Sequence, residues 1–183
     1  MARPSIGLGD WDAPPGETVQ CTTRPIRGSR HPGGEGPEVA GTTTPGIASG
    51  QLALLIPVGS DTYAIALETV REVVVEPRVT QLPTSPPVVR GVFNVRGDII
   101  PLLDTGLLLG LRACMEEPYA VLVETAHGTA GLVATDMPQT VRLNESVGHS
   151  DMEGTTETYL VADARLAVAL DVPVLLSPAR ISQ

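Results

Sequence analysis

Short apolar runs separated by turn residues make up most of the chain after residue 50. The runs are rich in Val, Ile and Leu, and they are too short for long amphipathic helices. Residues 67–70 predict a helical turn or bend, residues 107–111 predict one helical turn, and the polar stretch 144–158 predicts a loop. The pattern predicts short strands over residues 52–58, 62–66, 73–75, 88–95, 99–103, 119–125, 129–134, 139–143, 159–161, 166–170 and 174–176. We therefore expect an all-β domain, built as a barrel or a sandwich.

The first 50 residues have a different composition. They hold 7 of the 17 Pro and 10 of the 19 Gly, and Trp11 is their only aromatic residue. Such a segment buries too little apolar surface to offset the entropy lost on ordering. The sequence predicts a disordered Pro/Gly-rich tail over residues 1–50 and one domain over residues 51–183.

The charge of the chain excludes some classes of partner. The net charge is −9, and residues 51–183 carry 8 Arg against 16 acidic residues. An acidic surface argues against nucleic-acid binding and against anionic membranes. No apolar run approaches the roughly 18 residues of a membrane-spanning helix, and the first residues do not form a signal peptide. We expect a cytoplasmic protein without direct membrane insertion, and two Cys far apart, Cys21 and Cys114, fit a reducing compartment.

Residues 90–104, which read RGVFNVRGDIIPLLD, hold polar and turn-forming residues that core packing does not explain. Gly97 follows Arg96 where a two-residue hairpin turn requires a positive φ. The side-chain amide of Asn94 is placed to tie the turn together. Pro101 lacks a backbone donor, which predicts an edge or bulged strand.

This segment resembles the CheW-like domain family, in which Gly, Asn and an Arg-Gly pair precede an apolar run with Pro and then Asp. The resemblance extends over about residues 51–178. It implies two small five-stranded barrels packed together, and a non-enzymatic adaptor that couples chemoreceptors to a CheA-type histidine kinase. One barrel would bind the regulatory domain of the kinase, and the groove between barrels would receive the cytoplasmic tip of the receptor. The adaptor would thereby be recruited to membrane receptor arrays, in a flagellar or a non-flagellar pathway.

The resemblance also implies the site. The Glu of a Val-x-Glu-hydrophobic segment, here Glu72, and the Arg of the 90–104 segment, here Arg96, are neighbours near the partner surface in the family. A guanidinium can hold a carboxylate and still present donors outward. The predicted partner-binding residues are Val70, Glu72, Val73, Asn94, Val95, Arg96 and Gly97. The terminal helix of the family is expected to be truncated at residues 177–178.

The alternative function is an aspartic-protease-like hydrolase. Asp104-Thr105-Gly106 follows an apolar strand, as in enzymes whose two carboxylates share one proton. A chain of this length would need a homodimer to supply the second Asp. The Arg96-Gly97-Asp98 tripeptide spells an adhesion motif, but nothing places it outside the cell. His31, His127 and His149 are dispersed, so we expect no metal site and no cofactor.

Overall fold

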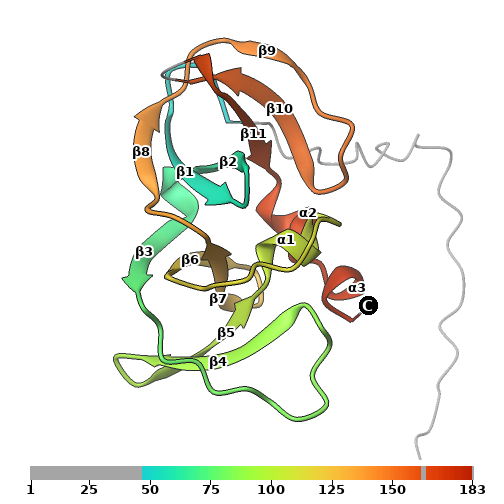
Figure 1. The fold of residues 1–183 in the computed structure, drawn as a ribbon. Helices are drawn as coiled ribbons and strands as arrows, with labels where there is room; N and C mark the ends of the chain where they lie inside the picture. Colours follow the sequence, from blue (N-terminus) through green and yellow to red (C-terminus); the bar gives the residue numbers. More distant parts are fainter. Residues whose placement is uncertain (1–46, 162–163, 183) are drawn as a thin grey trace, which may run out of the picture. The chain divides into compact units, whose positions relative to one another are not determined.

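The structure, a computed structural model, describes residues 47–161 and 164–182, and these form two β-sheets with short helices (Figure 1). The six-stranded sheet has the order β8-β1-β2-β11-β10-β9, and the five-stranded sheet has the order β3-β6-β7-β5-β4. The prediction of an all-β architecture with two small sheets is confirmed. One sheet has six strands in place of the expected five.

Most elements follow the apolar pattern closely. The six-stranded sheet contains β1 (Leu52–Val58), β2 (Asp61–Ala66), β8 (Gln139–Arg142), β9 (Ser146–His149), β10 (Thr155–Leu160) and β11 (Leu166–Leu170). The five-stranded sheet contains β3 (Val70–Val75), β4 (Val89–Val95), β5 (Asp98–Leu103), β6 (Tyr119–Thr125) and β7 (Gly128–Ala134). The helical turns are η1 (Leu67–Thr69), α1 (Thr105–Leu108), α2 (Val172–Leu175) and α3 (Pro178–Ile181). None of the helices in the described residues is long and apolar enough to cross a membrane.

The unbroken apolar run of β1 is explained by burial on both faces of the strand. Successive side chains of a strand point to opposite faces. Leu54 and Ile56 join the larger hydrophobic cluster, which includes residues of both sheets, whereas Ala53 and Leu55 join a smaller cluster within the six-stranded sheet. A strand with two buried faces has no reason to alternate apolar and polar residues.

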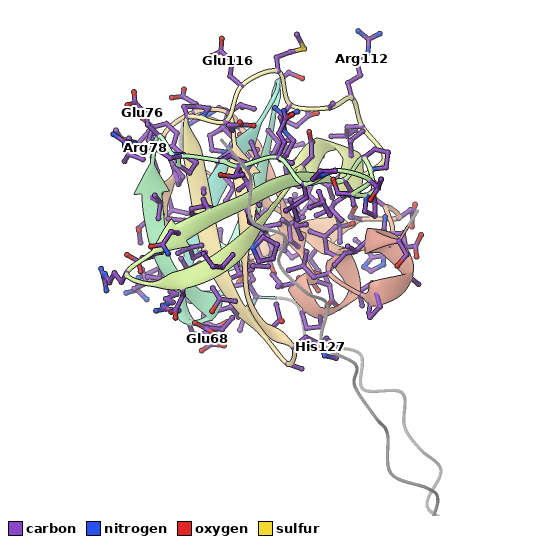
Figure 2. The ribbon with its side chains drawn as sticks, turned by 90° about the horizontal axis from the view of Figure 1, so that it is seen from below. Glu68, Glu76, Arg78, Arg112, Glu116 and His127 are labelled. Atoms are coloured by element: carbon purple, nitrogen blue, oxygen red, sulfur yellow. The ribbon has the colours of Figure 1, made fainter. Side chains whose placement is uncertain are left out.

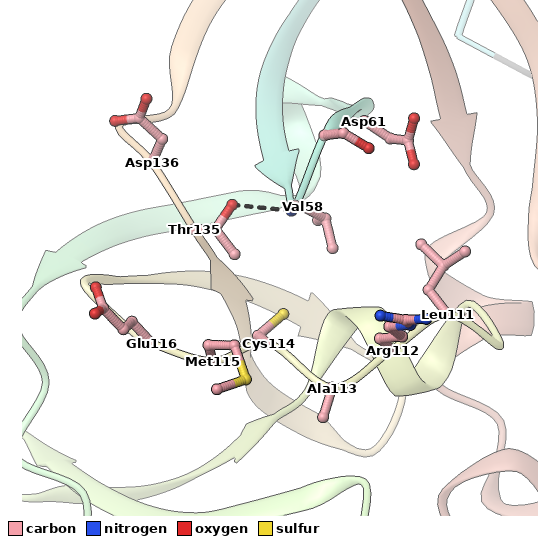
Figure 3. Close-up of a pocket in the computed structure, with 12 residues that line it drawn as sticks. Val58, Asp61, Leu111, Arg112, Ala113, Cys114, Met115, Glu116, Thr135 and Asp136 are labelled. Carbon is pink, nitrogen blue, oxygen red and sulfur yellow. Dashed lines mark hydrogen bonds between the residues drawn. The ribbon is translucent and has the colours of Figure 1, made fainter.

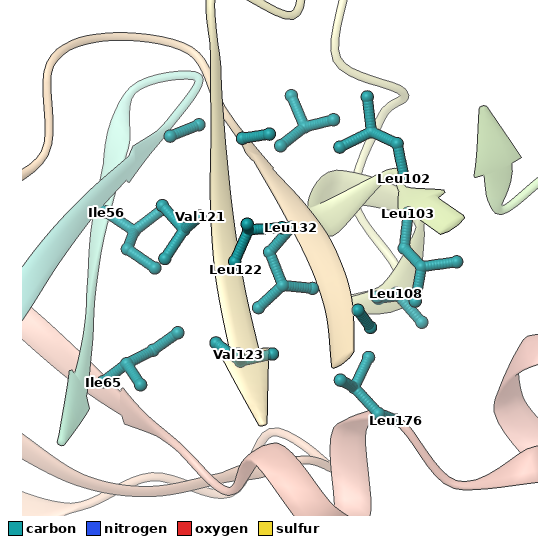
Figure 4. Close-up of a cluster of buried hydrophobic side chains, with 14 of the residues drawn as sticks. Ile56, Ile65, Leu102, Leu103, Leu108, Val121, Leu122, Val123, Leu132 and Leu176 are labelled. Carbon is teal, nitrogen blue, oxygen red and sulfur yellow. The ribbon is translucent and has the colours of Figure 1, made fainter. Parts of the chain in front are cut away.

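The five-stranded sheet contributes the centre of the larger cluster (Figure 4). Val121, Leu122 and Val123 of β6 are all fully buried, so this central strand is also covered on both faces. Leu102 and Leu132, on the paired strands β5 and β7, are fully buried beside it. The predicted partner-binding residues lie on β3, β4 and the β4–β5 turn rather than on this buried strand.

The β4–β5 hairpin has the turn that the sequence predicts. Val95 pairs with Asp98, so Arg96 and Gly97 are the two turn residues, and their φ angles are 53° and 99°. Two successive positive φ angles characterise the turn type that fits the twist of a hairpin. The Asn94 Oδ1 atom accepts a hydrogen bond from the Gly97 N–H at 3.1 Å. The predicted role of the Asn94 side chain is confirmed.

Three expectations about the elements were wrong. The polar stretch 144–158 contains β9, an edge strand that is exposed along its length, and the start of β10, which is only partly buried, so neither shows an apolar pattern. Residues 174–176 belong largely to α2, where the Asp171 side chain caps the Val174 N–H. The chain also continues past Ser177 into α3, which begins at Pro178. The prediction for Pro101 holds at the level of the residue, because β5 pairs with β7 only at Leu102 and Leu103 and leaves Pro101 without a partner on that side, and the β4–β5 ladder has a register shift between Val89 and Gly91.

The predicted tail is mostly outside the described residues, so its state over 1–46 stays a prediction. Residues 47–50, which the sequence assigned to the tail, belong to the fold. Ile47 is buried, and its carbonyl oxygen accepts a hydrogen bond from the Tyr159 hydroxyl. Gly50 bonds through its N–H to the Leu143 carbonyl. The described fold therefore includes residues ahead of the predicted boundary at residue 51.

Candidate partner-binding site

Glu72 and Arg96 form an ion pair at the surface of the five-stranded sheet. The Arg96 Nη2 atom donates to the Glu72 Oε2 atom at 3.0 Å. The Arg96 side chain is 75% exposed and the Glu72 side chain is 24% exposed. The predicted pairing is confirmed. It joins β3 to the tip of the β4–β5 hairpin, although β3 and β4 are the two edge strands of this sheet.

A β-bulge in β3 adds a second arginine to the pair. The register of β3 against β6 shifts between Val70 and Glu72, which leaves Arg71 as the extra residue. The Arg71 guanidinium lies 3.4 Å from the Asp98 carboxylate and 3.9 Å from the Glu72 carboxylate. In a regular strand, Arg71 and Glu72 would point to opposite faces. The bulge brings them together.

We call Arg71, Glu72, Arg96, Asp98 and Glu124 the charged cluster; the Glu124 carboxylate lies 3.9 Å from Arg71. Sequence reasoning identified Glu72 and Arg96 but missed the other three. One of the three could have been predicted from the sequence. A hairpin turn at Arg96-Gly97 places Asp98 directly after the turn and therefore close to Arg96. The position of Arg71 depends on the bulge, which leaves no recognisable pattern in one sequence.

Exposed apolar side chains lie on two of the strands that carry the charged cluster. Val73 and Val75 on β3 are 36% and 63% exposed, and Ile99 on β5 is 65% exposed. Val70 is half-buried and packs against the larger hydrophobic cluster. Val95 is buried in that cluster, so its side chain offers almost no surface to a partner. Val95 was predicted to be a partner-binding residue, whereas in the structure its side chain packs in the hydrophobic core.

The remaining predicted residues shape the hairpin tip. Asn94 and Gly97 are exposed, and the hydrogen bond between them fixes the turn that carries Arg96.

The edge strand β4 is held by the segment that follows β3, because Thr80 exchanges two backbone hydrogen bonds with Val92, at 2.7 Å and 2.9 Å. Gly91 permits this contact, since a Cβ there would lie 2.3 Å from the Thr80 carbonyl oxygen. The residues after β3 therefore reach β4 and help to close the sheet on itself.

The Asp104 carboxylate has a structural role. It is fully buried and accepts hydrogen bonds from the backbone N–H groups of Leu107 and Cys114. Arg90 lies 3.6 Å from the same carboxylate and also bonds to Glu117. A protease carboxylate must reach substrate and share a proton with a second acid. This geometry gives no support to the protease alternative.

No group of three or more His, Cys, Asp or Glu side chains within the described residues is placed to hold a metal ion. Cys114 is buried, and burial is the main reason that the pKa of its thiol is raised. A thiol that stays protonated is a poor nucleophile and a poor metal ligand.

A hollow of about 470 Å³ lies beside η1, next to the start of β3. It is lined by Gly50, Gln51, Leu52, Ala66, Leu67, Glu68 and Arg142. Leu52 is 43% exposed there, so the hollow presents apolar surface between charged side chains. Because η1 leads directly into β3, the hollow and the charged cluster lie on neighbouring parts of the chain.

Comparisons with known proteins agree with this architecture. "Chemotaxis protein CheW" of Helicobacter pylori is 28% identical over 103 residues, which is 55% of this chain and 60% of that protein. "Protein PilI" of Pseudomonas aeruginosa is 35% identical over 81 residues, which is 43% of this chain and 46% of that protein. The matches thus span between about half and three fifths of these curated relatives.

A solved structure gives an independent comparison of the fold. The crystal structure of the scaffolding protein TtCheW from Thermoanaerobacter tengcongensis superposes with a TM-score of 0.62 at 19% identity, covering 73% of this chain and 97% of that one. At this identity the likeness shows the fold alone. The model of the CheW-like domain family matches residues 52–180, well over half of the sequence. The chain belongs to the CheW-like domain family, a family of scaffold and adaptor proteins.

Proposed function

We propose that this chain is a non-enzymatic adaptor that couples chemoreceptors to a CheA-type histidine kinase. The regulatory domain of the kinase and the cytoplasmic tip of a receptor are its two partners. The adaptor works in the cytoplasm and is recruited to receptor arrays at the membrane. Its signalling partners belong to a flagellar or a non-flagellar chemosensory pathway, and the likeness to both CheW and PilI relatives is compatible with either.

The Glu72–Arg96 ion pair is the observation that carries this proposal. An exposed ion pair contributes only about 0–1 kcal/mol to folding, so its placement needs another explanation. Among the described residues, Arg96 uses only Nη2 in a hydrogen bond, and its side chain is 75% exposed. A guanidinium held in this way offers directed donors to a partner carboxylate or carbonyl.

Apolar surface next to the charged cluster supplies the second requirement of a protein interface. Val73 and Val75 on β3 and Ile99 on β5 expose apolar side chains on the strands that carry Glu72 and Asp98. Interfaces combine an apolar centre with polar groups that fix the register of the partners. We assign Val70, Glu72, Val73, Asn94, Arg96 and Gly97 to the docking surface, with Asn94 and Gly97 acting through the shape of the turn and Val95 as packing beneath it.

The hollow beside η1 is the proposed receptor contact. It lies at the Leu52 end of β1 and combines the half-exposed Leu52 with Glu68 and Arg142. An apolar side chain from a helical hairpin tip would enter the hollow, and polar groups around it would orient the helix. The kinase and the receptor would then bind neighbouring surfaces of one small domain, which is how an adaptor without chemistry can couple them.

Titration calorimetry with a CheA-type regulatory domain and with a receptor cytoplasmic fragment tests the proposal. Arg96→Glu and Glu72→Arg are each expected to weaken binding of at least one partner about tenfold or more, as charge reversal at a central contact does. The double variant restores the opposite charges and is expected to regain part of the affinity. A double variant that binds no better than the weaker single variant would count against a functional pair.

Matched controls separate the pair from general charge effects. Arg165→Glu and Glu145→Arg change the net charge by the same amounts at exposed positions just before β11 and β9 of the six-stranded sheet. They are expected to leave both affinities within about twofold. If the controls weaken binding as much as the variants of the pair, long-range charge rather than the charged cluster sets the affinity, and the proposed site is wrong.

A further inference from the structure

A second groove lies at the opposite end of β1 from the hollow beside η1 (Figure 3). It has a volume of about 660 Å³. It is lined by Val58, Gly59, Ser60, Asp61, Leu111, Arg112, Ala113, Cys114, Met115, Glu116, Thr135 and Asp136. Leu52 borders the hollow and Val58 borders the groove, so the two are separated by the length of β1, about 20 Å. We call this second site the acidic groove.

The walls of the acidic groove are held in place by hydrogen bonds. The Thr135 hydroxyl accepts from the Gly59 N–H at 3.0 Å, and the Thr135 N–H donates to the Pro57 carbonyl at 2.9 Å. The Cys114 N–H bonds to the buried Asp104 carboxylate, which anchors the wall formed by residues 111–116. A preformed groove avoids the entropy cost of ordering its walls on binding.

Exposed apolar side chains give the acidic groove a surface on which an apolar partner can bury area. Met115 is 91% exposed, and Leu111 is 36% exposed. Met137, which follows Asp136 in the chain, is 59% exposed. Unbranched, polarizable methionine side chains adapt their shape to different apolar partners. Exposed methionines beside a groove suit a surface that another molecule covers.

The charge around the acidic groove selects the partner. Asp61, Glu116 and Asp136 stand on its rim, and Arg112 is the one basic residue among those that line it. Within residues 47–161 and 164–182, no ion pair engages any of these three carboxylates. A partner that brings Lys or Arg would supply the missing cations, whereas a second copy of this acidic chain would add like charge.

The shape of the groove favours a helix over an added strand. The groove is bordered by the β1–β2 turn and by connecting segments that are not strands, so it offers no strand edge to which an extended peptide would pair. We propose that the acidic groove binds a basic amphipathic helix of a partner protein. The apolar face of that helix would lie on Met115, Leu111 and Met137, and its Lys or Arg side chains would reach Asp61, Glu116 and Asp136. This site is separate from the charged cluster.

Methyl NMR of the full chain, labelled with ¹³C at the methionine methyl groups, tests the inference. The probe is a synthetic helical peptide with a Leu face flanked by Lys, and a peptide with Glu in place of Lys is its counterpart. The basic peptide is expected to shift the Met115 and Met137 methyl signals and to leave that of Met152 in place. Met152 is 37% exposed and lies outside the groove, so it is an internal control.

Two sets of variants add the charge test. Asp61→Asn with Asp136→Asn removes two rim charges and is expected to weaken binding of the basic peptide about three- to tenfold at low salt. Glu145→Gln with Asp151→Asn removes the same net charge elsewhere and is expected to change it less than twofold. Met115→Gln is expected to weaken binding without unfolding the chain, because its side chain is almost fully exposed.

Several outcomes would overturn the inference. The acidic peptide would bind as well as the basic one if charge complementarity were irrelevant. Equal effects of the two double variants would show that net charge alone attracts the peptide. If the Met115 signal shifted with protein concentration in the absence of peptide, a second copy of the chain would be the occupant, and the proposed partner would be wrong.

Discussion

Arg96 bonds to Glu72 across the two edges of one sheet. Glu72 lies on β3 and Arg96 follows β4, and these are the two end strands in the order β3-β6-β7-β5-β4. A 3.0 Å bond between them means that the sheet curls until its edges approach. Figure 2 shows the side chains of Arg112 and Glu116 at one end of the fold and those of Glu68 and His127 at the other. The ion pair marks where the two edges of the sheet meet.

We predict that the Glu72–Arg96 pair is nearly neutral for folding. Arg96→Ala is expected to lower the free energy of unfolding by no more than about 1 kcal/mol, because the arginine is 75% exposed and its attraction is screened by water. Urea unfolding followed by circular dichroism measures this change. A loss of several kcal/mol would show that the pair closes the barrel rather than serving a partner.

Asp104 is expected to be far more important for stability. Asp104→Ala leaves the buried Cys114 N–H without its acceptor and removes a partner of Arg90, which we expect to cost about 2–4 kcal/mol. Asp171→Ala is the matched control, since Asp171 caps another four-residue helix by bonding to the Val174 N–H. That cap alone is expected to cost about 1 kcal/mol. Equal costs in urea unfolding would mean that only the capping role of Asp104 matters.

Gly91 is predicted to be irreplaceable in the 90–104 segment. Its φ is +149°, and an added Cβ would lie 2.3 Å from the Thr80 carbonyl oxygen. Gly91→Ala is therefore expected to cost more than about 2 kcal/mol, because the Thr80–Val92 backbone pair must separate. Gly148→Ala, where no atom lies within 4 Å of the added Cβ, should change stability by less than about 1 kcal/mol. Thermal unfolding of both variants measures these changes. A Gly91→Ala variant that melts at the same temperature as the wild type would show that position 91 does not require glycine.

Tyr159 should make the fold sensitive to alkali. Burial, together with the nearby Glu157 carboxylate, raises the pKa of its phenol from 10.0 to about 12. The unfolded chain then loses this proton first, so the free energy of unfolding falls between pH 10 and pH 12, by up to about 2–3 kcal/mol from this group. Urea unfolding at a series of pH values should show a smaller fall in this range for Tyr159→Phe. If the Tyr159→Phe variant shows the same pH dependence as the wild type, Tyr159 does not cause the loss of stability between pH 10 and pH 12.

The sequence predicts the central features of the fold because local chemistry determines them. The Asn94 and Gly97 positions define the hairpin turn through short-range hydrogen bonding and positive φ, and both were found in the structure. β1 could be read from its apolar run because both of its faces are buried. Elements of this kind need no knowledge of distant residues.

The missed elements depend on context that lies far away in the chain. β9 is exposed along its length, and it forms because β10 offers it a pairing edge. The placement of Arg71 depends on a bulge against β6. α2 had a usable signal, since Asp171 followed by Pro173 is typical of a helix start. The pairing of Glu72 with Arg96 came from the family resemblance, because nothing within either segment indicates that these edges meet.

The proposed function requires this chain to link a CheA-type kinase to a chemoreceptor. Co-sedimentation with receptor-containing vesicles tests this link most directly. A CheA-type kinase is mixed with vesicles that carry a chemoreceptor, with no adaptor, with this chain, or with its Arg96→Glu variant. We predict that the wild-type chain brings the kinase into the pellet and that Arg96→Glu does so several-fold less well, while the Arg165→Glu control matches the wild type. Kinase that pellets equally with and without the chain would contradict the adaptor function.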